Sequence, residues 1–259
     1  MADEVKTIEY PEAASREMIE AGVFYGRKKS STNPKMRPCV LMNRGGIEII
    51  NLAKTSEELE RATAFLKERI KNGAQMLFVA TQPAAEEGVK KLAERFQVPY
   101  VTNRWAGGTI TNFKIISKRI EYLKKLRSDF ASGALQKYTK KERLGLEDEM
   151  NHLKELFGGI ELLMKEPDIL ITIDANLHMT AVREANRANI PVVALSNVDS
   201  DPDLINYLVP GNDNGRRSIN WFLEKIAVAI EEGLVLRAAV AKQLLEESAA
   251  KQAAEVKVK

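Results

Sequence analysis

Four segments of the chain share one pattern of apolar and polar residues. Each is an apolar run that ends in polar or turn-forming residues and is followed by a stretch with helical spacing. The runs at 76–80 and 169–173 are apolar almost without interruption, which is typical of parallel strands that are buried on both faces of a sheet. The strands predicted in this way are 75–81, 98–103, 168–174 and 190–197.

The segments around these strands complete an α/β pattern. Residues 84–96 and 177–189 have the length and the charged face of surface helices, and 207–209 can supply a short fifth strand. Upstream, 47–52 is predicted as a peripheral strand, followed by a helix over 56–72 with Ser56 as its N-cap. We therefore predict an α/β fold with a doubly wound parallel sheet.

The middle of the chain has a different, heptad-like spacing. Residues 128–144, which contain Ser132-Gly133 and a basic group, separate two stretches in which apolar residues recur three or four positions apart. This pattern predicts an antiparallel coiled-coil helical hairpin inserted into the sheet domain. Contact with another macromolecule is its favoured role, and a purely stabilising insert is the alternative. Its apolar stripe consists of Phe113, Ile116, Ile120, Leu123, Phe130, Leu146, Met150, Leu153, Phe157, Ile160 and Met164.

The last part of the chain predicts a closing helix. Apolar residues recur at helical spacing after Trp221, and Gly233 is expected to bend or end the helix. The stretch 237–259 has few large apolar groups and is predicted to be a frayed helix or a tail. The apolar positions of this helix are Phe222, Ile226, Ile230 and Leu234.

Composition narrows the class of protein. The 259 residues are 44% hydrophobic, enough for a substantial core, and the net charge of +3 is too small by itself to indicate nucleic-acid binding. The single cysteine, Cys39, excludes an intrachain disulfide and is interpreted as a small apolar filler in a reducing compartment. Neither a signal peptide nor an apolar run of membrane length is found, so we expect a cytoplasmic protein without a membrane partner.

A nucleotide-dependent enzyme is the alternative suggested by an α/β sheet, since such sheets bind ligands beyond the carboxyl ends of their strands. The loop Gln82-Pro83-Ala84-Ala85 after the first strand has neither a glycine-rich fingerprint nor a P-loop ending. The pair Gly107-Gly108 leaves two possibilities open, because its amides can face a phosphate or can form a tight turn.

Polar groups near other predicted strand ends carry weaker signals. Asp174, Asn176 and His178 could act as an acid, a base and a ligand, although helix capping is the favoured interpretation. A bound ion near Asp201, Asp203 and Asp213 also stays open. No catalytic residue, resident metal or cofactor is predicted.

The strongest electrostatic feature is a segment without acidic residues, 21–47. Asn33-Pro34 and Arg37-Pro38 exclude a regular helix, so we predict an irregular, extended loop whose cations follow an RNA backbone without reading its bases. Phe24 and Tyr25 add possible stacking groups. Further basic residues lie on the hairpin and near 216. The RNA-binding residues predicted in all are Arg27, Lys28, Lys29, Asn33, Lys35, Arg37, Arg44, Lys114, Lys118, Arg216 and Arg217.

Several motifs together resemble a known family, the second protein of the bacterial small ribosomal subunit. The order and spacing of these motifs match that family over roughly 15–233, with the hairpin between the two signatures. The motifs are Gly22-Val23-Phe24-Tyr25-Gly26, Asn33-Pro34-Lys35-Met36, the run 47–52 with Lys54-Thr55, Trp105-Ala106-Gly107-Gly108-Thr109 with Thr111-Asn112-Phe113, and Asp201-Pro202-Asp203 with Pro210-Gly211-Asn212-Asp213.

The resemblance implies a flavodoxin-like α/β domain with a coiled-coil protrusion and no catalysis. It implies binding to small-subunit ribosomal RNA, contact with neighbouring small-subunit proteins, and a location on the cytoplasmic ribosome rather than as a free homo-oligomer. It also implies recruitment of the large, multi-domain mRNA-binding protein of that subunit, and so support of translation initiation. The implied organisation is an RNA-facing segment and first part of the α/β domain at 1–112, the hairpin at 113–164, the second part at 165–235, and a tail at 236–259.

The chain departs from the family pattern near its N-terminus. Histidines are usual in the family where this chain has Phe24, Arg27 and Glu48, and a tryptophan is usual where it has Thr32. Gly45-Gly46 follows Arg44 where the family has Asn-Gly. These differences remove potential metal ligands and a stacking group, and Arg27 is predicted to offer a phosphate contact instead.

Overall fold

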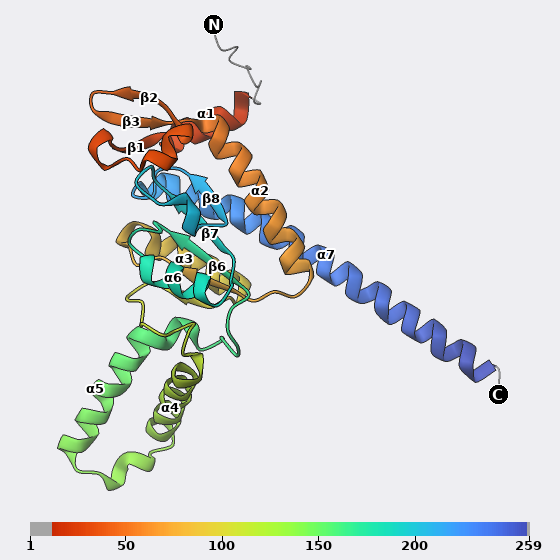
Figure 1. Cartoon of the computed structure of the whole chain (residues 1–259). Helices are drawn as coiled ribbons and strands as arrows, with labels where there is room; N and C mark the ends of the chain where they lie inside the picture. Colours follow the sequence, from red (N-terminus) through yellow and green to blue (C-terminus); the bar gives the residue numbers. More distant parts are fainter. Residues whose placement is uncertain (1–11, 258–259) are drawn as a thin grey trace, which may run out of the picture.

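The computed structural model describes residues 12–257, with the side chains of 12–15, 241 and 243–257 outside the description. The N-terminal residues 1–11, on which the expectation about a signal peptide rests, lie outside it as well. A central sheet with its helices forms the body of the molecule (Figure 1). A smaller sheet lies at one end, two helices project as an arm at the other, and a long C-terminal helix leaves the body.

Five parallel strands form the central sheet, as predicted. Their order is β5-β4-β6-β7-β8, and every neighbouring pair is parallel. All residues of β4, β6 and β7 are buried, which explains their uninterrupted apolar sequences. The strands are β4 (Met76–Val79), β5 (Tyr100–Val101), β6 (Ile169–Ile173), β7 (Val192–Ser196) and β8 (Tyr207–Pro210).

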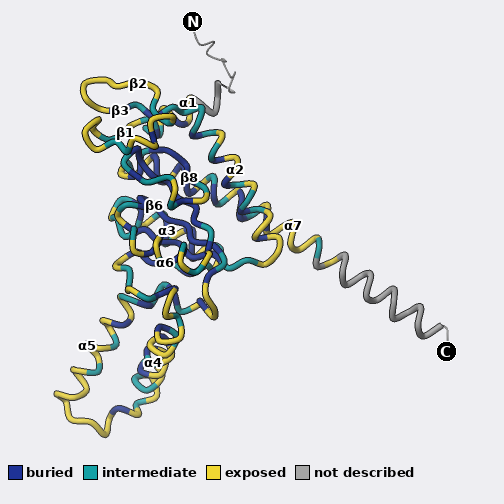
Figure 2. Tube along the Cα trace, viewed as in Figure 1, coloured by how far each residue is buried: buried dark blue, intermediate teal, exposed yellow. Residues whose placement is uncertain are grey.

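Both faces of this sheet are covered. Phe78 and its same-face neighbours pack against the helices α2 (Leu52–Lys71), α3 (Pro83–Phe96) and α7 (Arg216–Lys257). Leu77 and the opposite face pack against α6 (Met179–Arg187) and the root of the arm. The sheet is therefore the buried middle layer of the body, as the burial colours show (Figure 2).

Helix α2 begins four residues before its predicted N-cap. The side chain of Asn51, and not of Ser56, accepts a hydrogen bond from the backbone N–H of Ala53 at 3.0 Å. Thr55 is buried in the first turn and donates its hydroxyl to the carbonyl of Pro210 at 2.7 Å. Asn51 is the better cap because it directly follows the strand and can satisfy the orphan N–H groups of the first turn.

The arm consists of α4 (Phe113–Ala131) and α5 (Lys140–Phe157), which lie side by side (Figure 1). Short 3-10 turns, η3 (Ala134–Lys137) and η4 (Gly158–Ile160), flank α5. Coiled-coil packing of the two helices stays a prediction. Met164 is 82% exposed, so its place in the predicted stripe was wrong, whereas Leu163 is buried. The regular helix ends at Phe157, and the heptad phase does not continue through η4.

The segment 21–47 is a small folded sheet rather than the predicted irregular loop. After α1 (Glu12–Ala21), the strands β1 (Tyr25–Lys28), β2 (Val40–Arg44) and β3 (Ile47–Ile50) pair antiparallel in the order β1-β3-β2. The 3-10 turns η1 (Lys29–Ser31) and η2 (Pro34–Cys39) connect β1 to β2. Gly45-Gly46 has positive φ at both residues, as a two-residue hairpin turn requires, and joins β2 to β3.

Helix α7 runs through Gly233, so the glycine does not end the helix, which was one of the two predicted outcomes. A Cβ at Gly233 would lie 2.9 Å from the Cβ of Ile70 and 3.2 Å from the carbonyl oxygen of Lys67. The glycine therefore serves the close approach of α7 to α2. The predicted tail continues as helix to Lys257, and its last two residues lie outside the described chain.

Candidate nucleic-acid interface

Two cations flank an apolar residue across the exposed face of the small sheet. Lys28 of β1 and Arg44 of β2 are both paired with Ile47 of the central strand β3. Directly paired residues point to the same side of a sheet, so the three side chains form one row. All three are exposed, and Ile47 is 42% exposed. Neither cation has an ion-pair partner among the described residues.

A second row on this face is apolar. Tyr25 of β1 and Met42 of β2 are both paired with Ile49. Tyr25 is 51% exposed and Met42 is 54% exposed, while Ile50 on the opposite face is fully buried. We call the six residues of the two rows, Tyr25, Lys28, Met42, Arg44, Ile47 and Ile49, the small-sheet face.

Arg27 points away from this face and into the body. Its Nη2 lies 3.1 Å from the Oδ1 of Asp213 and 3.5 Å from the Oδ2 of Asp174, and its Nε lies 3.6 Å from the Oδ2 of Asp199. The Arg27 side chain is 27% exposed and Asp213 is completely buried. Arg27 thus serves as the counter-ion of three carboxylates, which speaks against the predicted phosphate contact.

Asp213 is the most strongly perturbed titratable group in this cluster. Burial and the neighbouring carboxylate of Asp174 raise the pKa of Asp213 to about 7, although the Arg27 guanidinium opposes the change. The backbone N–H of Asn197 donates to Asp213 Oδ2 at 3.1 Å. The cluster therefore joins the small sheet to the loops that follow β6, β7 and β8.

Lys35 is also engaged within the chain. Its ammonium group lies 3.1 Å from the Oδ1 of Asp201 and 2.5 Å from the Oδ2 of Asp203, and these carboxylates raise the pKa of Lys35. Asn33 caps η2 by accepting from the N–H of Lys35, and its own N–H donates to the carbonyl of Val198 at 2.8 Å. Two of the predicted RNA-binding residues, Asn33 and Lys35, therefore hold the connection between η2 and the loop after β7.

These contacts also bear on the suggested ion site. Asp213 pairs with Arg27, while Asp201 and Asp203 pair with Lys35, so each carboxylate already has a cation of the chain. Within residues 12–257, no group of three or more His, Cys, Asp or Glu side chains is arranged to hold a metal ion.

The loop that begins at Trp105 binds a carboxylate of the chain itself. Glu184 on α6 accepts from the indole N–H of Trp105 at 3.0 Å and from the amide of Gly108 at 2.8 Å through Oε1. Its Oε2 accepts from the amides of Ile110 and Thr111. Burial acts to raise the pKa of Glu184, but these hydrogen bonds outweigh it and lower the pKa. The Gly108 amide therefore faces an internal anion in place of a phosphate.

Asp174 and His178 have structural roles. The Oδ1 of Asp174 accepts from the N–H of Leu177 at 3.0 Å, and its Oδ2 accepts from the side-chain amide of Gln82. His178 is buried, and burial lowers its pKa. Its Nε2 accepts from the N–H of Thr81, so its Nδ1–H donates to the carbonyl of Asp174 at 2.8 Å. A buried neutral imidazole with both nitrogens occupied favours a turn-stabilising role over acid–base chemistry.

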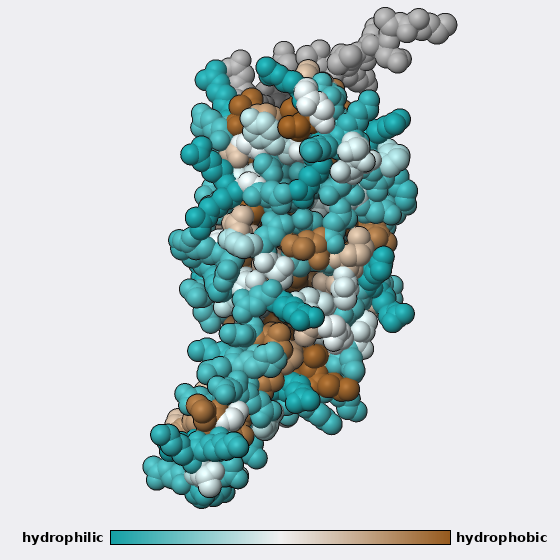
Figure 3. Space-filling model, turned by 90° about the vertical axis from the view of Figure 1, so that its left-hand side faces the viewer, coloured by the Kyte–Doolittle hydropathy of each residue, from teal (hydrophilic) through white to brown (hydrophobic). Residues whose placement is uncertain are grey.

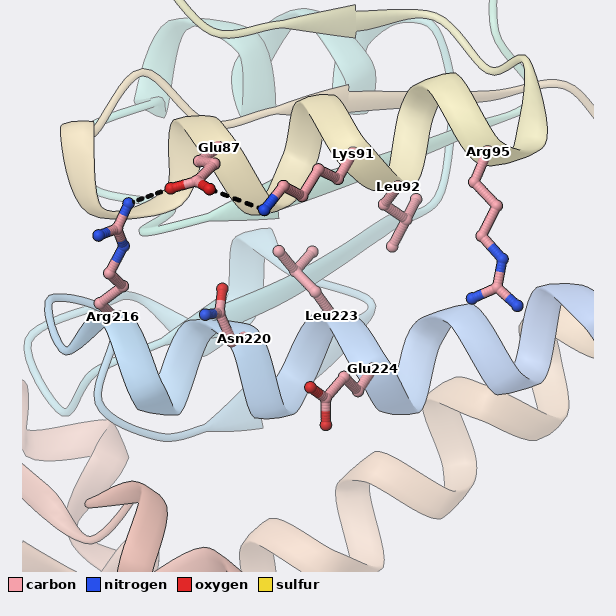
Figure 4. A pocket seen from close by; sticks show the side chains of 9 residues that line it. Glu87, Lys91, Leu92, Arg95, Arg216, Asn220, Leu223 and Glu224 are labelled. Atoms are coloured by element: carbon pink, nitrogen blue, oxygen red, sulfur yellow. Dashed lines mark hydrogen bonds and ion pairs between the residues drawn. The ribbon is translucent and has the colours of Figure 1, made fainter.

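Arg216 lies at a groove between α3 and α7 (Figure 4). The groove has a volume of about 480 Å³. Glu87 of α3 pairs with Arg216 across the groove and with Lys91 along its own helix, so the charge of Arg216 is partly neutralised, while Arg217 is exposed. Lys114 and Lys118 are exposed on α4, far along the chain from the small-sheet face.

Comparison with known proteins gives the family. The family model for ribosomal protein S2 matches residues 18–233, which is most of the chain. The chain belongs to the ribosomal protein S2 family. It is therefore a small-subunit ribosomal protein and a structural component rather than an enzyme, and its location is the ribosome in the cytoplasm.

Curated relatives of the same family are similar to this chain over most of their own length. The "Small ribosomal subunit protein uS2" of Thermus thermophilus is 42% identical over 214 residues, which cover 83% of this chain and 84% of the relative. The protein of that name in Corynebacterium jeikeium is 41% identical over 240 residues, 92% of this chain and 85% of the relative. The protein of that name in Nitratidesulfovibrio vulgaris is 41% identical over 222 residues, which cover 86% of this chain and 87% of the relative.

The predicted residues do not form one continuous site. The members near the small sheet that are exposed and have no ion-pair partner among the described residues are Lys28, Lys29, Arg37 and Arg44. Arg27, Asn33 and Lys35 instead contact other parts of the chain, although Lys35 is itself half exposed. The sequence interpretation missed the apolar row and the role of Glu184 as an internal anion. The glycine pair Gly45-Gly46, which is typical of a hairpin turn, was the available signal for the sheet face, while nothing local pointed to Glu184. No described helix combines the length and apolar character needed to cross a membrane.

Proposed function

We propose that this S2-family protein binds small-subunit ribosomal RNA through the cations on and beside the small-sheet face. The observation that carries the proposal is the row Lys28–Ile47–Arg44, in which two exposed cations without a carboxylate partner flank one apolar residue. Cations of this kind can bind phosphate without first breaking an internal ion pair, which Arg27 and Lys35 cannot do. Lys29 and Arg37 extend the same surface.

The proposed contribution of the predicted residues therefore differs among them. Lys28, Lys29, Arg37 and Arg44 contact phosphates directly. Arg27, Asn33 and Lys35 act by holding the small sheet against the body. Exposed cations elsewhere in the chain, Lys114, Lys118 and Arg217, form a second, separate contact with the RNA. Arg216 can join them when a phosphate replaces Glu87 as its ion-pair partner.

In this proposal the chain folds as a flavodoxin-like domain with a coiled-coil arm, and these two parts present the RNA-binding surfaces. The five-stranded parallel sheet with helices on both faces supports the first part, and the buried stripes of α4 and α5 support the second. The proposed division of the chain is 1–112, 113–164, 165–235 and 236–259, with the arm as the second part.

Sedimentation through sucrose gradients tests the RNA-binding proposal. The tagged chain is compared with the variant Lys28→Gln/Lys29→Gln/Arg44→Gln and with a control, Lys154→Gln/Arg183→Gln/Arg187→Gln, which removes three exposed cations elsewhere. We expect wild type and control to sediment with the small subunit at moderate salt, and the first variant to shift toward the top of the gradient as salt rises. Equal sedimentation of all three proteins at every salt concentration would contradict the proposal.

The exposed apolar residues of the small-sheet face favour a second partner, the large multi-domain mRNA-binding protein of the small subunit. Tyr25, Met42 and Ile47 are exposed together, and such a patch suits a protein contact better than a solvated surface does. Small subunits that carry Met42→Ser/Ile47→Ser are expected to retain this chain but to contain less of the mRNA-binding protein. Unchanged amounts of both proteins would contradict the second proposal.

A further inference from the structure

The turn between β8 and α7 contains an asparagine that is directly followed by a glycine, Asn214-Gly215. Residues 211–215 belong to no helix or strand, and Asn214 is exposed. Its backbone N–H is hydrogen-bonded, but its side-chain amide makes no hydrogen bond within the described chain. Figure 3 views the molecule from the side on which α7 begins in Figure 1, and most of this surface is hydrophilic. The side-chain amide of Asn214 is therefore open to water and can rotate.

Gly215 places a nucleophile next to this amide. Because glycine has no side chain, its backbone nitrogen can approach the Cγ of Asn214 without steric hindrance. A Cβ at Gly215 would lie 2.7 Å from the Nδ2 of Asn212, so the packing of the turn also requires the glycine. Within the described chain a single contact holds the Gly215 N–H, which donates to the Oδ1 of Asn212 at 3.1 Å. That acceptor belongs to a side chain of the turn itself, so a small local motion releases the nitrogen.

The second Asn-Gly pair of the chain, Asn72-Gly73 at the end of α2, is held differently. The ψ angle of Asn72 is 5°, so the nitrogen of Gly73 lies beside the backbone nitrogen of Asn72 and away from its side chain. The N–H groups of Gly73 and Ala74 both donate to main-chain carbonyls of α2, at 2.9 and 3.0 Å. An attack by the Gly73 nitrogen must first unwind this helix end, whereas no helix or strand constrains Asn214.

We infer that Asn214 is a site of spontaneous deamidation. The nitrogen of Gly215 gives its proton to water and attacks the Cγ of Asn214. The new N–Cγ bond forms while the Cγ–Nδ2 bond breaks, and Nδ2 takes a proton from water and leaves as ammonia. Water then opens the cyclic imide at either carbonyl carbon. Opening at Cγ gives aspartate, and opening at the main-chain carbonyl gives isoaspartate, in which the main chain runs through Cγ. Both products carry one new negative charge.

This charge appears at the start of α7, where Arg216 and Arg217 are the first two residues. Arg217 is exposed, while the side chain of Arg216 points toward Glu87 of α3 (Figure 4). A carboxylate at 214 suits the positive N-terminal end of the helix and competes with phosphate for Arg217. Deamidation therefore weakens one of the proposed RNA contacts. This consequence rests on the proposed RNA-binding function, whereas the chemistry at Asn214 does not.

Ageing of the purified full chain tests the modification site. Wild type, Asn214→Gln and Asn72→Gln are incubated at neutral and at mildly alkaline pH. Mass spectrometry of tryptic peptides follows the conversion, and enzymatic methylation detects isoaspartate. Glutamine keeps the amide group but would have to close a larger, less favourable ring. We expect Asn214 to react about 10-fold or more faster than Asn72, because unwinding of the helix end loses backbone hydrogen bonds. The rate should rise with pH, since the attacking nitrogen must lose its proton, and only Asn214→Gln should abolish the fast conversion.

The urea-unfolded chain serves as a reference, because both Asn-Gly pairs are accessible in it. An Asn214 that stays intact in the folded chain while it converts in the unfolded chain overturns the inference, as does faster conversion at Asn72 than at Asn214 in the folded chain.

The variant Asn214→Asp tests the consequence for RNA. It carries the charge of the product and should unfold at the same temperature as wild type or a higher one. We expect its binding to transcribed small-subunit ribosomal RNA to have a salt slope lower by about 1. Binding equal to that of wild type overturns the effect on RNA. Absence of wild-type binding overturns the proposed RNA-binding function, which the ageing experiment does not require.

Discussion

Arg27 on the small sheet and Asp213 after the last strand of the central sheet form an ion pair of 3.1 Å, although they are 186 positions apart in sequence. Asp213 is fully buried, and the same guanidinium also faces Asp174 and Asp199. This one cation therefore compensates three carboxylates and ties two sheets together.

Removal of Arg27 is expected to destabilise the fold. Arg27→Met leaves Asp213 buried without its cation, and we expect the free energy of unfolding to fall by about 2–4 kcal/mol. Urea unfolding measures the change, and Arg37→Met serves as a control at an exposed cation. The double variant Arg27→Met/Asp213→Asn should recover part of the loss, because the two residues are coupled. Equal stability of Arg27→Met and wild type would show that the ion pair does not contribute.

Asp213 should make stability depend on pH around neutrality. In the folded chain its pKa is raised to about 7, whereas an unfolded aspartate has a pKa of about 3.9. The folded chain therefore binds the proton more tightly, and stability falls as pH rises from about 4 through 7. The full effect is on the order of 4 kcal/mol.

The variant Asp213→Asn isolates this contribution. Burial lowers the pKa of His178, which acts in the opposite direction because stability is lost as pH falls below about 6.5. The stability difference between wild type and Asp213→Asn should therefore change across pH 5–8, and urea unfolding at several pH values measures it. A pH-independent difference would mean that Asp213 titrates as an ordinary aspartate.

Glu184→Gln tests the internal anion of the Trp105 loop. A glutamine keeps the size of the side chain but provides only one acceptor oxygen, so two N–H donors lose their acceptor, either those of Ile110 and Thr111 or those of Gly108 and the Trp105 indole. We expect a loss of about 2–4 kcal/mol in the free energy of unfolding. The fluorescence of Trp105 should shift as well, since its indole N–H bonds to the same carboxylate. Glu166→Gln, at an exposed position, is the matched control.

Two helical glycines should respond in opposite directions to alanine. Gly233→Ala places a Cβ 2.9 Å from Ile70 and is expected to destabilise by about 1–3 kcal/mol. Gly145→Ala in α5 meets no atom within 4 Å and is expected to stabilise by about 0.5–1 kcal/mol, because alanine favours the helix. Thermal unfolding of both variants measures the contrast. Destabilisation by both would indicate that the glycine of α5 also has a packing role.

The central sheet was predictable because its strands are apolar on both faces, so that each appears in the sequence as an almost uninterrupted run of apolar residues. Of the small sheet only β3 was predicted, as the peripheral strand 47–52. The strands β1 and β2 were not predicted, because two of the four residues of β1 and four of the five residues of β2 are exposed, so neither strand has a long apolar run. The glycine pair at 45–46 was the one local signal of their pairing. The predicted strand 47–52 ends two residues beyond β3, so the following helix and its cap were predicted too late, at Ser56 in place of Asn51.

The candidate site was harder to predict than the fold. The basic character of 21–47 was evident, but whether a cation is free depends on carboxylates far away in sequence. Arg27 meets Asp174 at a separation of 147 positions, and Lys35 meets Asp203 at 168. The amides of the Trp105 loop likewise meet Glu184 only through the packing of α6.

The contacts of Arg27, Asn33 and Lys35 with the body have a consequence for ribosome assembly. They order the small sheet before any partner arrives, so docking of this surface does not require a coupled folding step. The small sheet is then already folded when it meets the nascent particle. The rate of association should therefore depend on ionic strength more than on conformational changes of the chain.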